Sequence, residues 1–145
     1  MPESIEEILE EYLELAKEII RERGDVSPIV AFFVDGRVVE AVCGSRESIR
    51  RAIDLGNFLE AEWLVVVFTG WMKKFEKEEA KEKIEEYKYG DIARSPEKKE
   101  VLVGQIKSKD GKRISRILTI RREKGEVEFE EEYTKIDNFD GYLSV

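Results

Sequence analysis

The sequence predicts an α+β fold, a two-layer arrangement of a mainly antiparallel sheet of five or six strands with helices on one face. Three observations support this class. A run with helical spacing opens the chain, an Asp-Gly pair joins two β-rich runs near residue 35, and the last third is a series of strand-like runs. The expected element order is α-β-β-α-β-(α)-β-β-β. A chain of 145 residues suits a single domain, 1–145, with a real hydrophobic core.

The first predicted element is a long amphipathic helix. Its apolar residues recur at spacings of three and four from Ile5 to Ile20. Ser4 followed by Glu7 matches a capping box, and Gly24 supplies a stop. We therefore expect the helix to begin just after Ser4 and to end at Gly24.

A hairpin, a second helix and a buried strand follow. The stretch PIVAFFVDGRVVEAVCG predicts the hairpin, because Asp35-Gly36 favours the positive φ angles of a type I′ turn. The segment SRESIRRAIDLGNFLEAE predicts a helix with Ser45 as its N-cap, and Gly56 either weakens it or lets a neighbour pack close. The apolar run WLVVVFTGW predicts a central strand that is buried on both faces.

The remaining third is predicted to be strands. Before it, MKKFEKEEAKEKIEEYKYG is helix-prone with a narrow apolar stripe. The runs KEVLVGQIKS and RISRILTIRR flank a turn at Asp110-Gly111. The last strand, GEVEFEEEYTK, alternates, which places Val127, Phe129 and Tyr133 on one face and three glutamates on the other.

The composition limits the chemistry and the partners. Charged residues make up 40% of the chain and are mostly Glu, Lys and Arg, which is typical of proteins from thermophiles. The chain has no histidine and one cysteine, Cys43, which excludes imidazole catalysis, an internal disulfide and a thiolate metal site. Cys43 is expected to be a small buried residue. With no apolar leader and no apolar run of membrane-spanning length, we expect a cytoplasmic protein without a membrane partner.

The net charge of −8 is unevenly distributed along the chain. The first predicted helix and the last predicted strand are acidic, whereas the segment 94–124 is basic. An acidic whole disfavours nucleic acid as a partner, although the basic segment leaves it possible. We favour the interpretation that the basic strands pair with the acidic ones.

One constellation has the residue types of a metal-dependent active site. Gln105 and Lys107 lie two apart on a predicted strand and share a face, and Asp91 and Glu100 precede them. Hard oxygen ligands hold Mg²⁺, and a lysine steadies hydroxide or phosphate beside it. The segment GDI…VGQIK resembles the Gly-x-Asp…Gln-x-Lys pattern of Mrr-like nucleases of the restriction-endonuclease type. The resemblance implies a divalent-metal nuclease with Mg²⁺ as cofactor; the alternative is a loop and a hairpin that bind no cofactor.

A second set of motifs covers more of the chain. It consists of WMKKF, a charged variable stretch, and RSPEKKEVLVGQIKSKDGKRISRILTIRR. With these motifs, residues 63–122 resemble a family of small uncharacterised proteins often found with phage or mobile genes. That family also begins with a helix and a hairpin, and it brings no known activity. Trp71, Met72 and Arg94 lie in the motifs and are candidate binding residues; the alternative is that they serve packing and ion pairing.

The expected function follows from these observations. The chain has no glycine-rich phosphate loop and no converging set of catalytic groups, so we expect a non-catalytic module that works through protein–protein contacts. A homodimer is expected, because an open sheet edge is available for pairing. Two alternatives stay open: the divalent-metal nuclease, and a small-molecule sensor with a pocket near Trp71 and Phe75.

Overall fold

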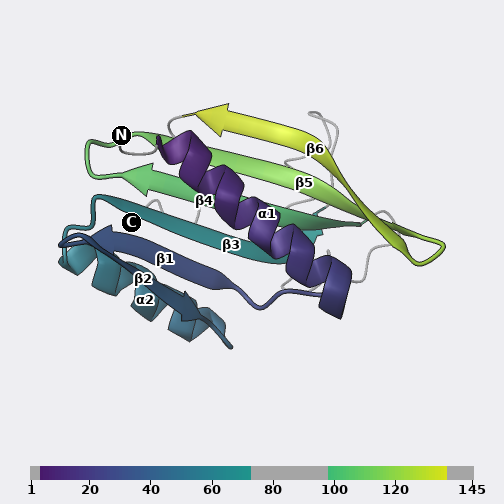
Figure 1. Ribbon diagram of the computed structural model, residues 1–145, viewed down its shortest axis with the longest axis horizontal. Coiled ribbons are helices and arrows are strands. Elements are labelled where there is room, and N and C mark those ends of the chain that lie inside the picture. The colour runs from purple at the N-terminus through teal and green to yellow at the C-terminus, as the bar shows by residue number, and fades with distance from the viewer. Residues whose placement is uncertain (1–3, 73–97, 137–145) are drawn as a thin grey trace, which may run out of the picture.

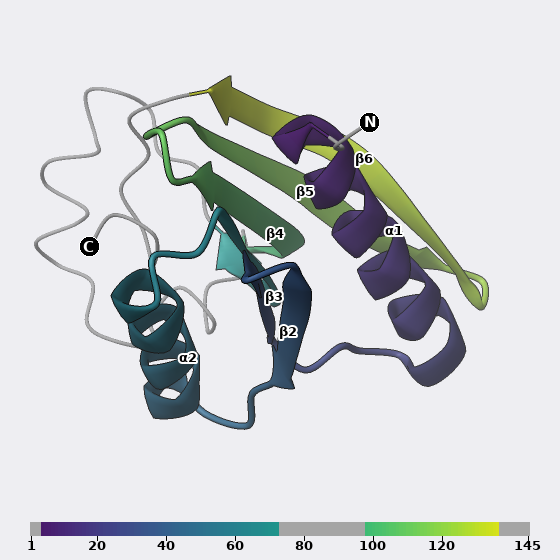
Figure 2. The same ribbon diagram turned by 60° about the vertical axis from the view of Figure 1, so that its left-hand side comes forward.

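The computed structural model describes residues 4–72 and 98–136, and these form a six-stranded sheet with one helix on each side (Figure 1; Figure 2). The elements are α1 (Ile5–Arg23), β1 (Ile29–Val34), β2 (Arg37–Val42), α2 (Arg46–Phe58), β3 (Trp63–Met72), β4 (Lys99–Ser108), β5 (Arg113–Glu123) and β6 (Glu126–Ile136). The strand order is β2-β1-β3-β4-β5-β6, and every neighbouring pair is antiparallel. The predicted α+β class and antiparallel sheet are confirmed. The helix-prone segment before β4 lies outside the described residues.

The prediction that the helices gather on one face is wrong. The core under α1 includes Ala31, Val65 and Ile106, whereas the core under α2 includes Phe32 and Leu64. Neighbouring residues of a strand point to opposite faces, so the two helices cover opposite sides of the sheet (Figure 2). The physical reason is that β1 and β3 are continuous apolar runs, and each of their faces must be covered.

Both described helices begin at the predicted caps. The Ser4 hydroxyl accepts a hydrogen bond from the Glu7 amide at 3.3 Å, and Gly24 ends α1 with a φ of 90°. Ser45 caps α2 and forms a reciprocal capping box with Ser48. The boundaries of both helices therefore follow from short-range hydrogen bonding.

Two glycines let the helices approach the sheet closely. A Cβ atom on Gly56 of α2 would lie 2.6 Å from Cδ1 of Leu64 on β3. A Cβ atom on Gly104 of β4 would lie 2.8 Å from Cδ2 of Leu13 on α1. The prediction that Gly56 permits close packing is confirmed, and Gly104 plays the same part on the other face.

The predicted turns are confirmed. Asp35 and Gly36 join β1 to β2 with φ angles of 50° and 73°, as a type I′ turn requires. Lys124 and Gly125, which are not among the turns predicted from the sequence, join β5 to β6 with φ angles of 50° and 80°. Gly111 lies in the β4–β5 turn with a φ of 94°. These positions take the conformation that glycine adopts without steric cost.

The last strand departs from simple alternation. The β5–β6 register shifts between Ile117 and Leu118, so β6 has one residue more than its partner there. Phe129 packs against the core under α1, whereas Tyr133 pairs with Ile117, on the other side of the register shift. The prediction that Tyr133 shares a face with Phe129 is therefore wrong, because the bulge moves every later side chain to the other face.

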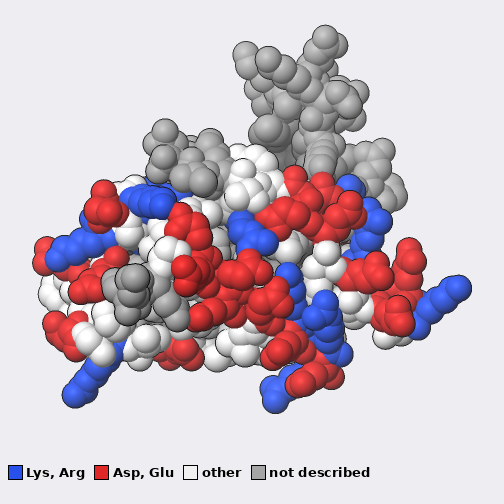
Figure 3. Space-filling model, turned by 45° about the horizontal axis from the view of Figure 1, so that its top comes forward, with Lys and Arg blue, Asp and Glu red and all other residues white. Residues whose placement is uncertain are grey.

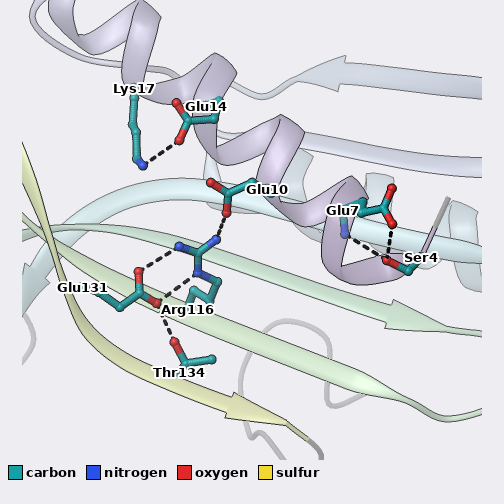
Figure 4. Close-up of polar contacts among 8 residues, drawn as sticks. All are labelled: Ser4, Glu7, Glu10, Glu14, Lys17, Arg116, Glu131 and Thr134. Atoms are coloured by element: carbon teal, nitrogen blue, oxygen red, sulfur yellow. Dashed lines mark hydrogen bonds and ion pairs between the residues drawn. The ribbon is translucent and has the colours of Figure 1, made fainter.

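Basic residues of β5 pair with acidic residues of α1 and β6, as expected. The Arg116 guanidinium donates to both carboxylate oxygens of Glu131, at 3.0 and 2.9 Å, and also contacts the Glu10 carboxylate of α1 (Figure 4). Arg121 pairs with Glu130 on the opposite face. Figure 3 shows lysines and arginines set among the acidic side chains that gather on one face of the molecule. In these ion pairs, acidic residues of α1 and β6 neutralise basic residues of β5.

Candidate functional site

β4 carries three of the four residues of the predicted nuclease site, but it divides them between two faces. Gln105 and Lys107 share the face opposite α1, whereas Glu100 lies on the α1 side. Glu100 accepts hydrogen bonds from Arg122 at 3.1 and 2.9 Å. Arg122 also donates to the carbonyl of Gly24 at 2.6 Å, at the end of α1. Glu100 thus helps to anchor the helix and does not meet Gln105 and Lys107.

The other predicted members are not placed. Asp91, the fourth residue of the nuclease site, lies outside the described residues, as does Arg94, one of the candidate binding residues. Within the part of the chain that the structure describes, no group of three acidic or cysteine side chains is arranged to hold a metal ion. The divalent-metal nuclease stays a prediction. Of the residues proposed for its site, those that the structure describes on one face are Gln105 and Lys107.

Gln105 is a buried polar residue in the middle of the sheet. It lies between Val66 of β3 and Ser115 of β5 and is 2% exposed. Its Oε1 atom has no hydrogen-bond donor among the described residues. Leaving a buried acceptor unpaired costs about 1–3 kcal/mol, so stability alone does not explain a glutamine here.

An open cleft of about 400 Å³ lies where the end of α2 meets the β4–β5 turn. Lys107 and Arg113 are cross-strand partners there, so their side chains share one face. Burial, and then the positive charge of Arg113, hold the pKa of Lys107 below its ordinary value. The residues lining the cleft are Asn57, Glu60, Ala61, Lys107, Ser108, Lys109, Gly111 and Arg113. This cleft, which we call the cationic cleft, presents two adjacent positive charges.

Trp71 and Met72, two of the candidate binding residues, end β3. The Trp71 side chain is 48% exposed, and the Lys98 ammonium lies 4.4 Å from its ring centroid. Met72 is half-buried. Phe75 lies outside the described residues, so the sensor pocket near Trp71 stays a prediction.

Cys43 is buried, as expected. Burial raises the pKa of its thiol above the ordinary value, and a hydrogen bond with Ser48 acts in the opposite direction. A raised thiol pKa leaves little thiolate at neutral pH, so Cys43 has the properties of a packing residue rather than of a nucleophile.

The sequence predicts an open sheet edge but does not identify β2 as the exposed apolar strand that forms one. On β2, Val38 is 49% exposed, Val39 is 40% exposed and Val42 is 74% exposed. β2 is an edge of the sheet, since its one partner among the described strands is β1. The run RVVEAV indicated a strand, but only the strand order shows that its outer side is open.

A second set of exposed apolar side chains lies on the outer side of α2. Leu55, Phe58 and Leu59 have the i, i+3, i+4 spacing of one helical stripe, and all three are exposed, Phe58 by 82%. Asn57, on the other flank of the helix, lines the cationic cleft beside β4. The stripe lies on the side of α2 away from its buried residues Ile49 and Ile53, so it points to solvent.

The hairpin determines which backbone groups of β2 are free. The residues that flank a two-residue turn form a hydrogen-bonded pair, so Arg37 and every second residue after it direct their N–H and C=O groups toward β1. The amide of Cys43 continues this alternation by donating to the carbonyl of Pro28 at 2.8 Å. The groups that point away from the sheet are those of Val38, Glu40 and Val42.

No protein-family model, no curated protein and no solved structure matches the chain. None of the described helices is long and apolar enough to cross a membrane. The described residues define an α+β domain with one open apolar edge, which we call the β2 edge (Arg37–Val42), and one cationic cleft.

Proposed function

We propose that the protein is a non-catalytic interaction module that forms a homodimer by pairing the β2 edges of two copies. The observation that carries this proposal is an edge strand with exposed valines and outward N–H and C=O groups. Such an edge is a template for another strand. Its pairing also shields apolar surface that is otherwise exposed to water.

A second copy suits this edge because the free backbone groups are self-complementary. In a two-fold antiparallel arrangement, residues with outward groups face one another and exchange N–H···O=C bonds. Val38, Glu40 and Val42 are such residues, and they alternate along a strand of six residues. The sheet would then run continuously through the dimer.

The β6 edge is much less suited to pairing. Glu128 and Glu130 are exposed there. Of these two, Glu130 forms an ion pair with Arg121 of β5. Two acidic strands placed side by side repel one another, and charged edge residues are a common protection against strand addition. The difference between the edges supports β2 as the site of the contact.

Val42→Lys is the variant that tests the proposal. Val42 is already largely exposed in one copy, so the substitution leaves the fold of the single chain intact. We expect the wild-type protein to sediment as a dimer and Val42→Lys to sediment as a monomer with an unchanged circular dichroism spectrum. Tyr133→Lys on the β6 edge is the matched control, with the same change of charge at an exposed apolar residue, and it should remain a dimer.

Amide hydrogen exchange tests the geometry of the contact. Protection of the Val38, Glu40 and Val42 amides should increase with protein concentration, because only these amides of β2 point outward. A wild-type protein that sediments as a monomer at the highest attainable concentration would contradict the proposal. A dimer in which these amides exchange at the same rate at every concentration would move the contact away from β2.

A further inference from the structure

The cationic cleft holds a charge arrangement that folding alone disfavours. Lys107 and Arg113 lie directly opposite one another on β4 and β5, and like charges in this position repel. No carboxylate of the described residues forms an ion pair with either side chain. The lowered pKa of Lys107 has burial as its first cause and this neighbour as its second.

The acidic groups near the cleft are already engaged. Glu60, the acid that lines the cleft, lies 3.9 Å from the Lys109 ammonium. Asp110, in the adjoining turn, accepts hydrogen bonds from the Ser108 hydroxyl and the Lys112 amide. Three cations against one acid leave the lining with a net positive charge, on a protein whose total charge is −8.

We infer that the cationic cleft binds the phosphate group of a small molecule between Lys107 and Arg113. The planar guanidinium of Arg113 suits two oxygens of a phosphate, and the Lys107 ammonium supplies a compact second charge. An anion between the two side chains replaces their repulsion by two attractive contacts. The amide of Asn57, on the α2 side of the cleft, adds a neutral hydrogen-bonding group.

A small ligand fits this site better than a nucleic acid. The cleft occupies about 400 Å³, which is a volume for a metabolite-sized molecule. A polyanion would extend beyond the cleft over a surface that is acidic as a whole, and it would be repelled there. A small phosphate compound meets only the local positive field.

Inorganic phosphate is the probe for the first experiment. Binding is measured by calorimetry and by the shift of the melting temperature, at constant ionic strength with chloride as the balancing anion. We expect saturable binding to the wild-type protein, weakened at least tenfold in Lys107→Gln/Arg113→Gln. Without phosphate the double variant should melt at or above the wild-type temperature, because the repulsion between the two side chains is gone. Lys124→Gln, which removes a positive charge at the exposed β5–β6 turn outside the cleft, is the control and should bind as the wild type does.

Three outcomes would overturn the inference. The first is the absence of saturable binding to the wild-type protein. The second is an equal rise in melting temperature in all variants, which is the general effect of phosphate as a salt. The third is a single-stranded oligonucleotide that binds through Lys107 and Arg113 more tightly than phosphate does. If the double variant fails to fold, Lys107→Gln alone gives the same comparison.

Discussion

At the scale of single residues, Gly104 determines how closely α1 approaches the sheet. Leu9 and Leu13 of α1 lie over its Cα, and a Cβ atom there would come within 2.9 Å of both side chains. Both leucines are almost completely buried, so they have little room to move aside. Gly70 of β3 is the opposite case, since a Cβ atom there meets nothing within 4 Å.

We predict that Gly104→Ala lowers the free energy of unfolding by about 1–3 kcal/mol, because it overpacks the core under α1. Gly70→Ala is the matched control, and it should leave stability unchanged or raise it by about 0.4–1 kcal/mol. Urea unfolding followed by circular dichroism measures both. Equal stability of the two variants would show that α1 does not hold its position above Gly104.

At the scale of elements, Arg116 joins three of them. It lies on β5, binds Glu131 of β6 through two hydrogen bonds and contacts Glu10 of α1 (Figure 4). Burial alone would raise the pKa of Glu131, but hydrogen bonds from Arg116 and Thr134 outweigh it and hold the pKa below its ordinary value. A carboxyl with a lowered pKa stabilises the fold at neutral pH, and this contribution is lost as the pH falls through the lowered value.

We predict that Arg116→Met lowers the free energy of unfolding by about 1–3 kcal/mol at pH 7. The difference from the wild type should shrink as the pH falls from 7 toward 3, because Glu131 then becomes protonated in both proteins. Urea unfolding across this range measures it. Arg121→Met is the control: its ion pair with Glu130 joins two side chains that are each more than half exposed, so the effect should stay below about 0.5 kcal/mol. A difference for Arg116→Met that does not change with pH would contradict the role of Glu131.

At the scale of the whole molecule, ion pairs connect elements that are distant in the sequence. Lys112 of the β4–β5 turn pairs with Glu6 of α1, and Arg122 of β5 pairs with Glu100 of β4. The cost of desolvating such charges falls as the temperature rises, so ion-pair networks contribute most at high temperature. The charge-rich composition and these contacts support the proposal of a thermophilic source.

We therefore predict a melting temperature above about 80 °C, compared with about 45–65 °C for mesophilic domains. Differential scanning calorimetry measures it, with protein concentration varied because dimer formation also raises the melting temperature. A melting temperature in the mesophilic range would contradict the thermophilic source. It would leave the dimer and the cationic cleft unaffected.

The predictions that were confirmed depend on residues close together in the chain. Ser4, Gly24 and the Asp35-Gly36 turn were identified because caps and tight turns are decided within four or five residues. The same short-range reasoning also excludes one prediction, the grouping of Glu100 with Gln105 in a metal site. Glu100 and Gln105 are five positions apart on a strand, so the two-residue period already places them on opposite faces.

The sequence alone thus determined the two described helices, the six strands, two of the turns and the buried character of β3. Only the tertiary structure decided that α1 and α2 cover opposite faces, that a bulge turns Tyr133 away from Phe129, and that β2 is an open edge. Local elements follow from contacts within a few residues of the chain. Strand order, the side that a helix covers and the exposure of an edge depend on contacts between distant segments, which hydrophobic periodicity does not encode.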